Sequence, residues 1–166
     1  MRSLLPARRR LIAVAAALLI ASSGCSSDSG GSDNDTAKLT AEEIVRQLVE
    51  KVPSARASVV YTADTDPNEL LGRPGGYTSK AGFTDVRITD EEPDGRVEAG
   101  GSVEVFAKSG QARKRAEYIS AVTEGMPMLG PEYDYVAGPV LLRVAQGLTP
   151  DEAKEYETAL RIIVKA

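Results

Sequence analysis

The spacing of hydrophobic residues after residue 39 alternates between a helical period and a strand period. Apolar side chains recur every three to four residues in 40–52, 109–124 and 149–164, which predicts three amphipathic helices. Short stretches rich in β-branched and aromatic residues predict strands at 57–63, 83–89, 102–107, 133–136 and 140–145. This order predicts an α+β fold, in which an antiparallel sheet of about five strands is packed by two or three helices.

Capping sequences mark where the helices begin. Thr40 and Thr149 each precede a glutamate by three residues, which is the spacing of a capping box. Ser109 is the predicted N-cap of the middle helix. Pro53 ends the first helix, because proline lacks the backbone N–H that a helix needs.

One face of the predicted sheet mixes apolar and charged side chains. Its members are Val60, Glu104, Phe106, Leu141 and Arg143. Such a face is too apolar to be left wholly in water. We therefore expect either that the first helix covers part of it or that it is a surface for a partner.

The least regular part of the domain is the segment 64–80. Its four glycine and proline residues between 72 and 76 disfavour a helix or strand, and a loop of this length is often functional. We therefore predict a binding site here. The candidate ligand-binding residues are Asp66, Asn68, Arg73, Tyr77 and Lys80, together with Arg143 from the last strand.

Three interpretations of this segment remain open. Residues 64–68 share the opening of an EF-hand calcium loop, but Glu69 and Gly75 stand where that loop needs a glycine and a glutamate. A second interpretation is an anion nest of backbone amides around Gly75, with Arg73 and Lys80 nearby. The third is an ordered turn whose two leucines pack into the core. We expect no metal and no cofactor.

The N-terminus has the layout of an export signal. Arginines 8–10 precede an apolar run at 11–21, and small residues then lead to Cys25, the only cysteine. The run is too short for a membrane-spanning helix, which takes roughly 20 residues. Residues 1–24 are therefore a predicted signal peptide. The Ser-, Gly- and Asp-rich stretch 25–39 is a predicted disordered tether, and 40–166 a single α+β domain.

The ending Ser-Ser-Gly-Cys25 resembles the lipobox of bacterial lipoproteins. Ser22 departs from that pattern, in which a leucine, valine or isoleucine is usual. The alternative is ordinary cleavage that leaves a free thiol. We expect lipidation of Cys25, which would anchor the protein at the extracytoplasmic face of the cell membrane. The arginines also partly resemble a twin-arginine signal, so the export route stays open.

Composition excludes several classes of function. Removing residues 1–24 leaves 16 basic and 24 acidic residues, a net charge of −8, which argues against nucleic acid and against anionic lipid as general partners. The chain has no histidine, so Ser-His catalysis and histidine zinc sites are excluded. We do not expect an enzyme. Carboxylate chemistry by Asp85, Glu98 and Glu104 is the residual enzymatic hypothesis.

Three segments carry a resemblance. Residues 66–80, which include Asp-Pro-Asn-Glu-Leu-Leu-Gly-Arg-Pro, together with 103–107 and 135–144, are similar to a group of small uncharacterised secreted lipoproteins of Gram-positive bacteria. The resemblance implies an exported, lipid-anchored protein and lends no catalytic residue. Our leading hypothesis is a tethered module that binds an unknown protein or small ligand through the 64–80 loop or the open sheet face. The alternative is an inhibitor of an exported hydrolase.

Overall fold

A computed structural model describes residues 39–89, 96–126 and 131–165. The predicted signal peptide, Cys25 and the tether up to residue 38 lie outside these ranges. Within the described ranges, every helix falls short of the length and apolar content that a bilayer crossing needs.

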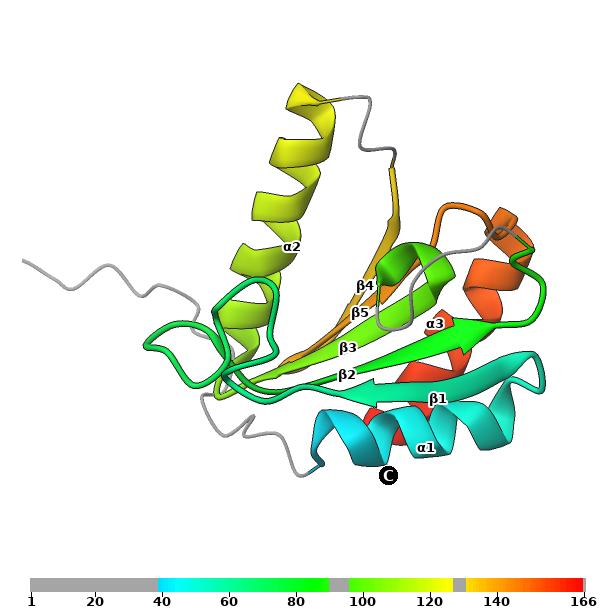
Figure 1. Cartoon of the computed structure of the whole chain (residues 1–166), viewed down its shortest axis with the longest axis horizontal. Coiled ribbons are helices and arrows are strands. Elements are labelled where there is room, and N and C mark those ends of the chain that lie inside the picture. The colour runs from blue at the N-terminus through cyan, green and yellow to red at the C-terminus, as the bar shows by residue number, and fades with distance from the viewer. Residues whose placement is uncertain (1–38, 90–95, 127–130, 166) are drawn as a thin grey trace, which may run out of the picture. The chain divides into compact units, whose positions relative to one another are not determined.

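The chain forms a five-stranded antiparallel sheet and three helices (Figure 1). In chain order the elements are α1 (Ala41–Lys51), β1 (Ala55–Val60), β2 (Tyr77–Asp85), a 3₁₀ turn (Val97–Ala99), β3 (Gly100–Phe106), α2 (Ser109–Gly125), β4 (Tyr133–Ala137), β5 (Val140–Val144) and α3 (Pro150–Lys165). The strand order across the sheet is β1-β2-β3-β5-β4, and every neighbouring pair is antiparallel. The predicted α+β fold is confirmed.

Helices α1 and α3 cover one face of the sheet and enclose the larger apolar core. Leu48 and Leu160 are fully buried there, and the rings of Phe83 and Tyr156 stack with centroids 4.9 Å apart. Both predicted capping boxes are present, since the backbone N–H groups of Thr40 and Thr149 donate to the glutamates three residues later. The core members that the structure describes all lie between residues 39 and 164.

Helix α2 covers part of the opposite face. Ala112 and Ile119 pack with Phe106, Leu141 and Tyr77 in a second, smaller apolar cluster. The expectation that the first helix covers this face is therefore wrong, because α1 lies on the other side. The turn between β1 and β2 adds its two leucines to the same cluster, as the ordered-turn interpretation predicted.

Two boundary predictions are also wrong. β2 begins at Tyr77 rather than at residue 83, because its first half carries Ser79, Lys80 and Gly82, which do not form an alternating apolar pattern. The N-cap of α2 is Lys108 rather than Ser109. The side chain of Gln111 accepts a hydrogen bond from the Lys108 N–H, which is the contact that the N3 residue makes in a capping box.

Candidate functional site

The register of the sheet gathers polar residues on the α2 face. Lys80 on β2 lies directly opposite Glu104 on β3. Ser102 lies opposite Arg143 on β5, and Arg143 lies opposite Asp134 on β4. Side chains directly opposite each other on one face come within contact distance. Residues that are far apart in sequence therefore form one polar cluster beside α2.

A β-bulge aims two of these residues at the same face. The pairing of β2 with β3 shifts between Tyr77, which faces Phe106, and Ser79, which faces Val105. Without the extra residue, Tyr77 and Lys80 would point to opposite faces, because side chains alternate along a strand. The bulge lets Tyr77 pack edge-on against Phe106, with ring centroids 5.8 Å apart, while Lys80 enters the polar cluster.

Asp66 is the anchor of the turn between β1 and β2. Its carboxylate accepts hydrogen bonds from Lys80 Nζ at 3.1 Å, from Tyr77 Oη at 2.6 Å, and from the backbone N–H groups of Leu70 and Leu71 at 2.8 and 3.1 Å. Burial alone would raise the pKa of Asp66, but the donors, Tyr77 first, outweigh it and lower the pKa to about 2. The carboxylate is a fixed anion whose oxygens are already engaged.

That arrangement counts against the calcium interpretation. In an EF-hand loop, the oxygens of Asp66 would face calcium. Here they accept hydrogen bonds from the Lys80 ammonium, the Tyr77 hydroxyl and the backbone N–H groups of Leu70 and Leu71. Among the described residues no group of three or more acidic, cysteine or histidine side chains is placed to hold a metal ion. Of the two cations of the anion-nest interpretation, Arg73 pairs with Glu69 on the surface, and Lys80 pairs with the buried Asp66.

Glu104 is the second buried anion of the cluster. Its side chain is fully buried and accepts from Arg115 Nε of α2 at 3.1 Å and from Arg143 Nη1 at 3.4 Å. Arg143 also makes a two-pronged contact with Glu132, at 2.8 and 2.9 Å. Each of the two buried acids is thus paired with at least one cationic side chain.

A hollow of about 480 Å³ opens over this cluster, and we call it the Lys80 pocket. Its polar lining comprises Tyr61, Asn68, Lys80, Ser102 and Arg143, with Arg96 and Glu98 also among the lining residues. The Lys80 ammonium sits 4.5 Å from the centre of the Tyr61 ring. Burial lowers the pKa of Lys80, and its neighbours Asp66 and Glu104 oppose this effect.

The hydroxyl of Ser102 is the unusual feature of the pocket. Ser102 is completely buried, and within the described residues its Oγ has no hydrogen-bond partner. A buried hydroxyl without a partner typically costs about 1 to 3 kcal/mol. Ser102 is one of the residues that line the hollow, so a bound ligand could supply the missing hydrogen-bond partner of its hydroxyl.

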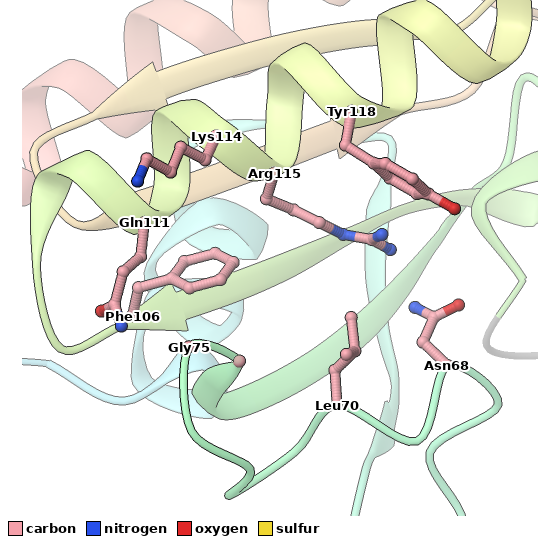
Figure 2. Close-up of a pocket in the computed structure, with 9 residues that line it drawn as sticks. Asn68, Leu70, Gly75, Phe106, Gln111, Lys114, Arg115 and Tyr118 are labelled. Atoms are coloured by element: carbon pink, nitrogen blue, oxygen red, sulfur yellow. The ribbon is translucent and has the colours of Figure 1, made fainter.

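A second hollow, of about 670 Å³, lies between α2 and the turn, and we call it the α2 groove. Figure 2 shows Lys114, Arg115 and Tyr118 extending from α2, Phe106 on β3, and Leu70 and Gly75 on the turn. Asn68 lines both hollows. With its amide oriented to satisfy the surrounding donors, the Asn68 oxygen accepts from Arg115 Nη2 at 3.2 Å and from Lys80 Nζ at 3.1 Å.

The structure brings together five of the six predicted ligand-binding residues. Asp66, Asn68, Tyr77 and Lys80 form one hydrogen-bonded group, and Arg143 joins it in the Lys80 pocket. Arg73 does not belong to it: its side chain is 65% exposed and contacts Glu69 on the surface.

Sequence reasoning missed other members of the cluster. Ser102, Arg115 and Asp134 were not candidates, although an acid such as Glu104 inside an apolar strand signals a buried cationic partner. The carboxylates of the residual enzymatic hypothesis do not converge. Glu104 belongs to the α2 face, whereas Asp85 accepts a hydrogen bond from Tyr156 of α3 on the opposite face.

Asp134 and Glu132 form a separate acidic pair beside Arg143. Burial, and next the charge of Glu132, raise the pKa of Asp134 to about 7. One oxygen of Asp134 is buried without a partner among the described residues. Neither acid lines the two hollows described above, so the pair is next to the candidate site rather than in it.

Comparisons with known proteins add no relative to this description, since the chain matches no protein-family model, no curated protein and no solved structure.

Proposed function

We propose that this chain is a lipid-anchored binding module of the extracytoplasmic membrane face, which binds a small anion in the Lys80 pocket. The anchor is the proposed acylation of Cys25 at the end of the signal sequence. The observation that carries the binding proposal is the fully buried Ser102 hydroxyl, which has no hydrogen-bond partner among the described residues. Ser102 lies opposite Arg143 of β5 and lines the Lys80 pocket.

The arrangement of charges favours an anion over a cation. Lys80, Arg96 and Arg143 line the pocket, while the only acid among its lining residues is Glu98. The acids that neutralise the cluster, Asp66 and Glu104, have completely buried side chains and are not among the residues that line the pocket. An incoming ligand would therefore meet ammonium and guanidinium groups first, and these suit the oxygens of a carboxylate or phosphate.

The volume of the pocket limits the ligand to a small molecule. Its 480 Å³ falls at the lower end of the range of roughly 300 to 1,000 Å³ that is usual for small-molecule sites. The aromatic ring of Tyr61 and the hydroxyl of Ser102 would add one apolar and one hydrogen-bonding contact. A carboxylate- or phosphate-bearing compound of about amino-acid size fits these limits.

Calorimetric titration of the chain 26–166 with glutamate, succinate and inorganic phosphate tests the binding proposal and distinguishes the two anion types. We expect heat of binding for at least one of these anions in the wild type, and at least tenfold weaker binding in Ser102→Ala. The exposed Ser58→Ala is the matched control and should bind like the wild type. The proposal would be contradicted if none of the three anions gave heat of binding, or if Ser102→Ala bound the anion as tightly as the wild type.

The anchor requires its own experiment. The mass of the mature protein from the native host should equal that of residues 25–166 plus two or three acyl chains. A mass that fits an unmodified Cys25 would refute the anchor without touching the binding proposal. The inhibitor and carboxylate-enzyme hypotheses stay predictions.

A further inference from the structure

The N-terminal half of α2 carries an exposed cationic surface on an otherwise acidic protein. Lys108, Arg113 and Lys114 are all exposed. Within the described residues, none of the three takes part in a salt bridge, unlike most cations of the sheet face. Three unpaired cations within seven residues form a local positive patch on a mature chain whose net charge is −8.

The α2 groove adds apolar surface to this patch. Lys114 and Arg115 line the groove together with Leu70 and Phe106 (Figure 2). Tyr118, also on the lining, is 61% exposed, and the Arg115 guanidinium lies 5.7 Å from the centre of its ring. Cations beside an exposed tyrosine and an apolar floor are the combination that favours the headgroup region of a phospholipid bilayer.

The patch lies at the end of the domain where the tether arrives. The backbone N–H of Ala41, the first residue of α1, donates to Ser79 Oγ at 2.9 Å, which fixes the start of the domain beside the start of β2. Tyr77, two residues earlier, lies opposite Phe106 of the groove. Figure 1 shows the start of α1, the turn and the start of α2 together at one end of the sheet.

The predicted tether would keep this end of the domain close to the bilayer. Thirteen residues, 26–38, separate Cys25 from the first described residue, Leu39, and a disordered chain of that length, as the sequence predicts, would have an end-to-end distance of about 20 Å. Lipid headgroups would therefore be at a high effective concentration around the patch. An acidic protein partner would have no such advantage, so the lipid is the occupant that the geometry favours.

We propose that the α2 groove and the cations Lys108, Arg113 and Lys114 bind anionic phospholipid headgroups of the membrane that carries the anchor. This contact would turn the α2 end of the domain toward the bilayer. The inference rests on the lipid-anchor part of the proposed function and is independent of the Lys80 pocket.

Vesicle flotation of the chain 26–166, which lacks Cys25, tests the proposal without the anchor. We expect the protein to float with vesicles that contain phosphatidylglycerol and phosphatidylcholine, and not with vesicles of phosphatidylcholine alone. Changing Lys108, Arg113 and Lys114 to glutamate should weaken binding by about 100-fold or more, because each basic residue near an anionic surface contributes about fivefold. Tyr118→Ser should weaken it by a smaller factor.

A matched control carries the same change of charge on the opposite face. Arg46, Lys51 and Lys165 are exposed residues of α1 and α3, and their replacement by glutamate should leave vesicle binding within about twofold of the wild type. Equal loss in both triple variants would show that net charge alone drives binding, and this would overturn the proposal. If the wild-type protein did not float with the anionic vesicles, the lipid-binding proposal would be overturned. The mass measurement on Cys25 tests the anchor separately and would not be affected by that result.

Discussion

The Lys80 ammonium lies 3.1 Å from Oδ1 of Asp66, and the two side chains are only 4% and 0% exposed. The pair joins β2 to the start of the turn, whose leucines also pack against the second apolar cluster. Because Asp66 also accepts from two backbone amides of the turn, the ion pair fixes the backbone that borders both hollows. The site and the stability of the turn therefore depend on the same contact.

We predict that Lys80→Met costs about 3 kcal/mol of unfolding free energy, because it leaves the buried Asp66 carboxylate without its cation. Asp66→Ala should cost more, since Tyr77 and two backbone amides lose their acceptor along with Lys80. The double variant should lose less than the sum of the single variants. Urea unfolding measures all three. The control is Arg73→Met, which removes the exposed pair with Glu69 and should change the unfolding free energy by less than about 0.5 kcal/mol. A loss in Arg73→Met as large as that in Lys80→Met would contradict this account.

Ser102→Ala should raise the stability of the ligand-free protein, which is unusual for a substitution in a buried strand. The change removes a fully buried hydroxyl that finds no partner in the described part of the chain, so the expected gain is about 1 kcal/mol. Thermal unfolding without added anion should show a higher midpoint than the wild type. A lower midpoint would mean that the hydroxyl already stabilises the fold, and would remove the main support for the Lys80 pocket.

Stability should fall as the pH rises from about 4 to about 7, because of Asp134. The raised pKa of about 7 means that the folded protein keeps a proton on Asp134 that the unfolded chain has already released. The contribution of Asp134 is thus fully present below about pH 4 and lost above about pH 7. Asp134→Asn should abolish this slope and gain about 1 to 2 kcal/mol at pH 8 relative to wild type. Urea unfolding at pH 5 and pH 8 measures the difference, and identical slopes for both proteins would refute the assignment.

Gly76→Ala should disrupt the turn. A Cβ at residue 76 would lie 2.0 Å from the backbone oxygen of Leu70, so the turn would have to open, at a cost of about 2 to 4 kcal/mol. Gly125→Ala is the control, because nothing lies within 4 Å of a Cβ there, and its stability should stay near that of the wild type. Hydrogen exchange of the backbone amides of residues 66–77 should be faster in Gly76→Ala than in the wild type. Unchanged exchange rates in this segment would contradict the prediction.

The architecture could be predicted because its signals are local. The capping sequences at Thr40 and Thr149 and the alternation in 140–144 each depend on a few neighbouring residues. The antiparallel pairing of the five strands follows the prediction. The side of the sheet that each helix covers depends on packing across the whole domain, and there the prediction for α1 was wrong.

The site was harder to predict because a bulge and the strand order create it. The sequence around Ser79 carries no pattern that predicts the β-bulge, whose extra residue puts Tyr77 and Lys80 on one face of the sheet. The placement of β5 beside β3 brings Arg143 to Ser102 and Glu104, and sequence alone does not give that order. Arg73 was a candidate by its proximity to the glycines, but exposure and a surface partner remove it from the cluster.

Asn68 stands in the common wall of the Lys80 pocket and the α2 groove. Its amide contacts Lys80 of one hollow and Arg115 of the other. A molecule that reorients this amide from one side must alter the donors presented on the other. If the proposed anion in the pocket changes the affinity of the groove for the proposed lipid, thermodynamic reciprocity requires that the lipid change the affinity for the anion by the same factor. Anion binding would then differ between the membrane-bound and the free domain.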